Sequence, residues 1–119
     1  MAKKIRKNED LQSLIRELKK TSLDNKVKIW KRIAEDLEKP TRNKRVVNVY
    51  KLSQYSKKDD VIVVPGKVLG SGDIDHSIQV AALSFSSQAI DKINEKGKVI
   101  TLRELIKTNP KGKNIKIIG

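Results

Sequence analysis

The sequence contains no cysteine, and this absence excludes disulfide bonds, thiolate metal sites and cysteine nucleophiles. It also fits a reducing compartment. No apolar run approaches the roughly 20 residues that a membrane-spanning helix needs, and the lysine-rich start lacks the apolar segment of a signal peptide. We therefore expect a cytoplasmic protein that does not enter a membrane.

Aromatic residues are also scarce, at 3% of the 119 residues, so the core has to be built from aliphatic side chains. Charged residues make up 34% of the chain and are expected at the surface. Trp30 is the single tryptophan, and its place in an apolar helical stripe predicts a core position rather than a role in base stacking. For Tyr50 and Tyr55 both interpretations stay open.

Basic residues outnumber acidic residues and give the chain a net charge of +13. Its distribution is uneven: residues 1–58 contain 18 Lys and Arg against 7 Asp and Glu, whereas residues 59–119 contain 9 against 7. A net charge this large and positive attracts polyanions. We therefore expect the polyanion-binding surface in the N-terminal half.

The first 40 residues predict a basic arm and a helical hairpin. Residues 1–7 show no apolar periodicity and are expected to order only on binding. Asn8 is predicted to cap a first helix, and Ser22 or Asp24 to start a second helix that ends at Pro40. The apolar stripes of these helices are Leu11, Leu14, Ile15 and Leu18, and Val27, Trp30, Ile33, Ala34 and Leu37. We expect the helices to pack antiparallel with both stripes against a sheet.

The hairpin is followed by the sequence Lys-Pro-Thr-Arg-Asn-Lys-Arg at residues 39–45, in which four of seven residues are basic and none is apolar. A solvated charge run and a localisation signal are the alternatives to a phosphate-binding loop. The convergence of basic arm, helix and loop in one half of the chain favours phosphate binding. The candidate RNA-binding residues are Lys3, Lys4, Arg6, Lys7, Lys28, Lys31, Arg32, Lys39, Arg42, Asn43, Lys44, Arg45 and, in the other half, Lys67.

After this loop the chain alternates strands and short helices, which predicts a mixed α/β fold. A pattern of two β-branched residues, a capping residue and an apolar pair occurs at 46–52 and again at 99–105, and an aliphatic strand follows each copy. We interpret these copies as two strand, short helix, strand units. Residues 1–45 would then form the arm, hairpin and basic loop, and residues 46–119 the strand and helix repeat domain, within one compact unit.

The stretch 61–97 between the two copies predicts strands and one helix. A strand at 61–64 is expected to stop at Pro65-Gly66, and the chain to extend again at 67–69. A third strand starts at Ile78, and a helix capped by Ser86 or Ser87 ends at Gly97. We expect Gly66, Gly70 and Gly72 to hold turns that need a positive φ.

No motif in the sequence supports catalysis or a cofactor. The glycines of 66–72 lack the spacing of a dinucleotide or Walker loop. His76, Asp73 and Asp75 match no zinc or EF-hand pattern. The serines at 84–87 lack a nucleophile elbow. We therefore expect no catalytic residue, no metal, no cofactor and no small-molecule substrate.

Three segments carry a family resemblance: the basic loop 40–45 running into Val-Asn-Val-x-Lys-Leu at 47–52, the Val-Val-Pro-Gly-Lys-Val-Leu-Gly-x-Gly sequence at 63–72, and Phe-Ser-x-x-Ala-x-x-Lys-Ile at 85–93. Through them the chain resembles the large-subunit ribosomal proteins that include the archaeal and eukaryotic protein eighteen-e and the bacterial protein fifteen. The resemblance implies an irregular superhelix of strand and short-helix units.

The same resemblance implies a structural protein of the large ribosomal subunit, in the cytoplasm, whose partners are ribosomal RNA and neighbouring ribosomal proteins. Charge by itself leaves one alternative open, a DNA-associated architectural or chromatin protein, because either nucleic acid attracts a basic surface.

Overall fold

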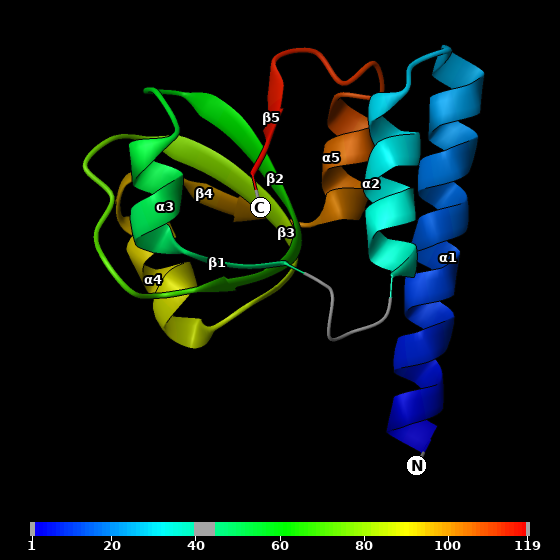
Figure 1. The fold of residues 1–119 in the computed structure, drawn as a ribbon, viewed down its shortest axis with the longest axis horizontal. Coiled ribbons are helices and arrows are strands. Elements are labelled where there is room, and N and C mark those ends of the chain that lie inside the picture. The colour runs from blue at the N-terminus through cyan, green and yellow to red at the C-terminus, as the bar shows by residue number, and fades with distance from the viewer. Residues whose placement is uncertain (1, 40–44, 119) are drawn as a thin grey trace.

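The computed structural model describes the backbone of residues 2–39 and 45–118 and the side chains of residues 11–39 and 46–118. A parallel sheet lies between two groups of helices (Figure 1). In chain order the elements are α1 (Ala2–Asn25), α2 (Ile29–Glu38), β1 (Arg45–Asn48), α3 (Val49–Gln54), β2 (Asp60–Leu69), β3 (Ile78–Phe85), α4 (Ser87–Lys96), β4 (Lys98–Ile100), α5 (Leu102–Thr108) and β5 (Ile115–Ile117). The predicted mixed α/β class, with a helix pair in front, is confirmed.

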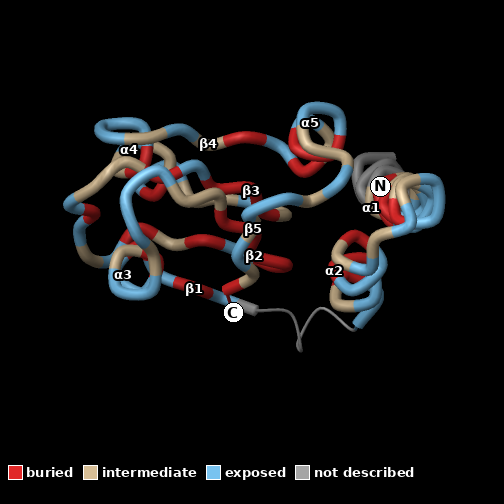
Figure 2. Tube along the Cα trace, turned by 90° about the horizontal axis from the view of Figure 1, so that it is seen from above, coloured by how far each residue is buried: buried red, intermediate tan, exposed pale blue. Residues whose placement is uncertain are grey.

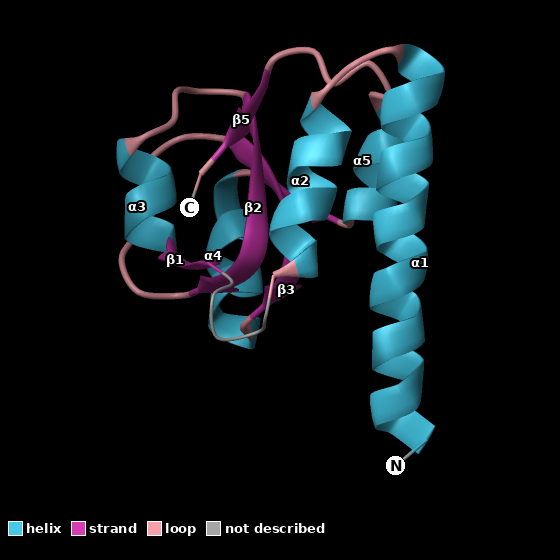
Figure 3. Cartoon of the chain, turned by 45° about the vertical axis from the view of Figure 1, so that its right-hand side comes forward, coloured by secondary structure: helices cyan, strands magenta, loops and turns pink. Residues whose placement is uncertain are grey.

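The first helix is longer at both ends than the sequence suggested. It begins at Ala2, so residues 2–7 are helical and the prediction of a cap at Asn8 is wrong. Alanine, lysine and arginine are good helix formers, and no Gly or Pro interrupts this segment. Figure 3 shows the N-terminal part of α1 extending past the end of α2. Among the described residues, no helix is long and apolar enough to cross a membrane.

The turn of the hairpin lies later than predicted, because Ser22 belongs to α1 and does not start α2. Its side chain is buried, its hydroxyl donates to the carbonyl of Val27, and the Val27 amide donates to the Ser22 carbonyl at 3.0 Å. Asp24 is also inside α1, and Lys26 has a φ of 56°, which turns the chain toward α2. A serine that bonds across the turn closes the hairpin from within the first helix.

The two apolar stripes pack as predicted. Leu14, Ile15 and Leu18 of α1 join a core cluster with the four buried residues of α2, which include Trp30. The same cluster contains Val63 and Ala81 from the sheet and apolar residues of α5. The helix pair is therefore attached to the sheet through one continuous aliphatic core.

The sheet combines the two predicted strand, short helix, strand units. In the order β1, β2, β3, β4 each strand is parallel to its neighbour, and β5 also pairs with β2. Arg45 to Asn48 pair with Gly66 to Leu69, whereas Ile115 to Ile117 pair with Val61 to Val63. Strands β1 and β5 thus pair with the same edge of β2, β5 along its N-terminal part and β1 along its C-terminal part. In the sequence, 66 residues lie between the end of β1 and the start of β5.

Strand β2 does not stop at Pro65-Gly66, and that prediction is wrong. It continues to Leu69, with an irregularity in its pairing to β3 between Val64 and Lys67. A bulge of this kind accommodates proline, which has no amide to donate to a ladder. The Pro-Gly pair bends the longest strand without ending it.

The two faces of the sheet carry different helices, as Figure 2 shows. Val63 and Ala81 face the cluster of α1, α2 and α5, whereas Ile62 and Val80 face the cluster of α3 and α4. Neighbouring residues of a strand point to opposite faces, so both faces of these central strands are apolar. This explains the aliphatic run that the sequence shows at 61–64.

The glycines act in different ways. Gly72 has the predicted positive φ, 93°, and a Cβ there would lie 2.4 Å from the Tyr50 Cβ. Gly66 and Gly70 have no positive φ, so that expectation is wrong for both. Gly70 instead permits close packing, because its Cβ would lie 2.7 Å from the Gln88 Cβ. Gly97 ends α4 as predicted, and Ser86 caps its start by accepting from the Ala89 amide at 3.1 Å.

Candidate nucleic-acid interface

The candidate RNA-binding residues that the structure describes lie on or directly beside four elements. Lys3, Lys4, Arg6 and Lys7 belong to the N-terminal end of α1, and their side chains lie outside the described part. Arg42, Asn43 and Lys44 lie outside the described residues altogether, and Arg45 opens β1. Lys28, Lys31, Arg32, Lys39 and Lys67 have described side chains, and all five are exposed.

Tertiary structure brings Lys67 to the basic loop. Strand pairing sets Arg45 opposite Gly66 and Val46 opposite Lys67, so a residue 22 positions later in the sequence lies beside the end of the loop. Val47 and Val68 are buried against α3 and α4, so Val46 and Lys67 point to the other face. Val46 is 62% exposed there. Lys67 thus lies on an exposed face beside Val46, the residue that follows the 39–45 loop.

Lys39 is held at the other end of this loop. Its Nζ lies 3.1 Å from Asp36 Oδ1, one turn earlier, and its side chain is about half exposed. An exposed pair of this kind contributes only about 0–1 kcal/mol, so the lysine exchanges its partner at little cost. Lys39 therefore remains available to a phosphate.

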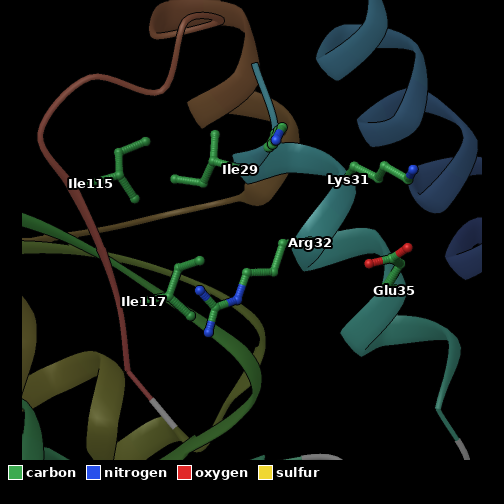
Figure 4. A pocket seen from close by; sticks show the side chains of 7 residues that line it. Ile29, Lys31, Arg32, Glu35, Ile115 and Ile117 are labelled. Carbon is green, nitrogen blue, oxygen red and sulfur yellow. The ribbon is translucent and has the colours of Figure 1, made fainter. Parts of the chain in front are cut away.

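The N-cap Lys28 and two basic residues of α2, Lys31 and Arg32, line a groove that the sequence did not predict. The groove has a volume of about 860 Å³, and Lys28, Ile29, Lys31, Arg32, Glu35, Ile115 and Ile117 surround it. Figure 4 shows Ile29 and Arg32 of α2 facing Ile115 and Ile117 of β5. No pattern along the chain points to this site, because β5 comes to α2 only through its pairing with β2.

Within the described part of the chain, no carboxylate forms an ion pair with Lys28, Lys31, Arg32 or Lys67. Other cations are engaged. Lys19 pairs with Glu38 at 3.0 Å, Arg103 with Glu17 at 2.7 Å and Lys116 with Asp60 at 3.1 Å. These ion pairs connect elements of the fold to one another. Lys28, Lys31, Arg32 and Lys67 therefore remain available to an external anion.

The structure also assembles a Ser, His and Asp arrangement that sequence spacing did not reveal. His76 Nε2 lies 2.8 Å from Ser56 Oγ, and His76 Nδ1 lies 2.5 Å from Asp75 Oδ1. A catalytic serine has to give its proton to the histidine. Here the Leu52 carbonyl lies 2.6 Å from Ser56 Oγ and competes with the ring for the single hydroxyl proton. The arrangement joins the loop before β3 to the end of α3.

No group of three His, Cys, Asp or Glu residues that would suit a metal ion occurs among the residues that the structure describes. Asp73, which is three residues before His76, has its Oδ1 3.8 Å from Lys92 Nζ. That lysine also donates to the Gly72 carbonyl at 2.6 Å. Asp73 and Lys92 together hold the glycine turn against α4.

Two carboxyl groups have a lowered pKa. The backbone amide of Lys57 donates to Asp60 Oδ2 at 2.7 Å and is the main cause of the lowered pKa of Asp60, to which the Lys116 ammonium adds. The hydrogen bond from His76 lowers the pKa of Asp75. Both carboxylates stabilise the fold in their charged form.

The Asp60 contacts predict an acid-dependent loss of stability. A carboxyl group whose pKa falls on folding stabilises the protein above its ordinary value of 3.8, and this contribution disappears as the pH falls through the folded value. Asp60→Asn should lower the free energy of unfolding by about 0.5–1 kcal/mol at pH 7, since the pair is partly exposed. Urea denaturation at a series of pH values should show this difference shrinking below pH 3.8.

Asp91→Asn is the matched control for this measurement. Asp91 is exposed on α4 and forms no ion pair with the described residues. The free energy of unfolding of the Asp91→Asn variant should be close to that of the unmodified protein at every pH. A pH-independent loss in Asp60→Asn would show that the side chain acts through shape and not through charge.

Comparison with known proteins places the chain among ribosomal proteins. Residues 9–101 match the family described as the ribosomal proteins 50S-L15 and 50S-L18e and their 60S counterpart. The chain is 50% identical over 120 residues to large ribosomal subunit protein eL18 of Methanothermobacter thermautotrophicus, with 99% of each chain covered. It is 48% identical to the eL18 protein of Methanoregula boonei, with 93% of each covered, and 46% identical to that of Archaeoglobus fulgidus, with 93% of this chain and 96% of the relative covered.

Proposed function

Because the chain belongs to the family of the ribosomal proteins 50S-L15 and 50S-L18e, we propose that it binds and stabilises ribosomal RNA as a structural, non-catalytic constituent of the large ribosomal subunit in the cytoplasm. The match covers residues 9–101, which include both apolar stripes, the basic loop and most of the sheet. Family membership is the observation that carries this proposal. It also decides against the DNA-associated alternative, which charge by itself left open.

The RNA contacts are assigned to polar residues of the 39–45 segment and to Lys67, whose partner in the sheet is Val46. These are Lys39, Arg42, Asn43, Lys44, Arg45 and Lys67, with Lys3, Lys4, Arg6 and Lys7 of α1 as a second group. Lys28, Lys31 and Arg32 of α2 add to the positive potential of this half of the molecule. The adjacency of Val46 and Lys67 in the sheet supports the first group.

Phosphates are the expected partners of these side chains. Each basic residue that replaces condensed counterions on the RNA contributes to affinity without reading sequence. An A-form helix presents its phosphates and sugar hydroxyls more openly than its base edges. The protein should therefore recognise the shape of a folded RNA segment and stabilise it, with neighbouring ribosomal proteins as further partners.

Sedimentation of a lysate that contains the tagged protein tests the proposal. We expect the protein in the fraction of the large subunit, and RNase treatment should release it whereas DNase treatment should not. Release by DNase only would favour the chromatin alternative. Sedimentation as a free monomer under all conditions would contradict both functions.

A further inference from the structure

We propose that the groove between α2 and β5 binds an extended segment of a neighbouring protein, which carries aliphatic and acidic side chains and adds as a further strand to the free edge of β5. The proposal rests on the proposed function in one respect, that the partner is a protein of the same ribosomal subunit. It assigns to Lys28, Lys31 and Arg32 a partner other than RNA.

The floor of the groove is apolar. Ile29 on α2 and Ile115 and Ile117 on β5 line it, and all three are only partly buried, whereas the central aliphatic residues of the sheet are fully buried. Covering such surface yields about 25 cal/mol per Å². An RNA backbone would leave these isoleucines without an apolar partner, whereas aliphatic side chains of a peptide would cover them (Figure 4).

The edge of β5 offers backbone hydrogen bonds. Among the described strands β5 pairs with β2 only, through Val61 to Val63, so its opposite edge has no strand beside it. Unpaired amide and carbonyl groups on an edge strand are a template for another extended chain. Ile115 and Ile117 pack toward the α2 cluster while Lys116, between them, reaches Asp60. An added strand would likewise direct alternate side chains into the groove.

The rim of the groove is positive. Lys28, Lys31 and Arg32 line it together with a single carboxylate, that of Glu35, and none of the three cations forms an ion pair with the described residues. A carboxylate suits the planar guanidinium of arginine, because two parallel hydrogen bonds form. Phosphate would satisfy the rim equally well, but only a peptide also uses the isoleucine floor and the strand edge.

Photocrosslinking inside assembled large subunits tests the proposal. We would place p-benzoylphenylalanine at Glu35, an exposed position on the rim, and at Glu95, an exposed position on α4 behind the opposite face of the sheet, as the matched control. From the Glu35 position we expect a crosslink to a protein segment that contains Asp or Glu beside aliphatic residues. A crosslink to RNA alone, to a basic segment, or at the level of the Glu95 control would overturn the proposal.

A charge reversal distinguishes binding in the groove from nonspecific attraction to the positive charge of the protein. Arg32→Glu in the crosslinking protein should lower the crosslink yield about three- to tenfold, as expected for losing one rim pair and gaining repulsion. Arg16→Glu, the same change at an exposed position on α1, should leave the yield unchanged. Equal loss in both variants would overturn the assignment to the groove.

Failure of this inference is distinguishable from failure of the proposed function. Both variants should sediment with the large subunit if the RNA contacts lie around β1. A protein that enters the subunit normally but gives no protein crosslink from Glu35 would contradict the groove and leave the ribosomal function standing. A protein that never enters the subunit would contradict the proposed function, and with it the groove.

Discussion

If Lys39, Arg42, Lys44 and Arg45 are all replaced with Ala, RNA affinity should depend less steeply on salt. The slope of the logarithm of affinity against the logarithm of salt concentration should become shallower by about three. Each phosphate contact releases counterions and is expected to steepen this slope by roughly 0.7 to 0.9, so the loss of four contacts accounts for the change. Between 50 and 200 mM salt, the unmodified protein should then lose about 60-fold more affinity for ribosomal RNA than the variant. A filter-binding titration over this range measures both slopes.

A control of equal charge has to leave the fold intact, and the structure decides which lysines serve. Lys92 is unsuitable, because its half-buried ammonium donates to the Gly72 carbonyl. Lys96, Lys98, Lys107 and Lys111 are exposed and form no ion pair with the described residues. Replacing these four with Ala removes the same charge from the other half of the chain. Equal flattening by the two quadruple variants would mean that the RNA surface lies elsewhere.

Replacing Trp30 with Ala should lower the free energy of unfolding by about 3–5 kcal/mol, the range found when a large aromatic residue leaves a core. Trp30 is fully buried in the cluster that joins α2 to the sheet. Its Nε1 donates to the Pro110 carbonyl at 2.6 Å, which fixes the turn before β5 to the helix pair. Urea denaturation followed by circular dichroism gives the value.

The Trp30→Phe variant separates the hydrogen bond from the packing. It keeps an apolar ring but removes the donor, and the lost hydrogen bond to the partly buried Pro110 carbonyl should cost about 1 kcal/mol. Tyr55→Ala, at a position 61% exposed, should change stability by less than about 0.5 kcal/mol. A loss in Trp30→Ala no larger than in Tyr55→Ala would contradict the core assignment of Trp30.

The local elements could be predicted from the amino-acid sequence, because their signals are contained in short stretches. The 3.6-residue spacing of Leu14, Leu18, Ile33 and Leu37 predicted both apolar faces of the hairpin, and all four are buried. Thr101 caps α5 through a reciprocal bond with Glu104, as its place before an apolar pair suggested. Motif similarity indicated the ribosomal family, which the comparisons confirm.

Helix ends and strand breaks were predicted less well, because competing bonds decide them. Ser22 has the chemistry of a cap, but its partner is the Val27 carbonyl across the turn. Pro65-Gly66 has the chemistry of a turn, but Gly66 pairs with Arg45 of β1 and pairing with β3 resumes at Lys67, which keeps β2 extended. In each case a contact beyond the neighbouring residues overrides the local preference.

The composition of the candidate surfaces could not be predicted, because it depends on how the strands pair. Lys67 lies beside the basic loop because β1 pairs with the C-terminal part of β2. Ile115 and Ile117 reach Ile29 and Arg32 because β5 pairs with the N-terminal part of the same strand. The spacing of residues along the chain does not indicate which edge of β2 each strand pairs with. Strand order and register depend on burying the apolar side chains of both sheet faces at the same time, and this happens only in the assembled core.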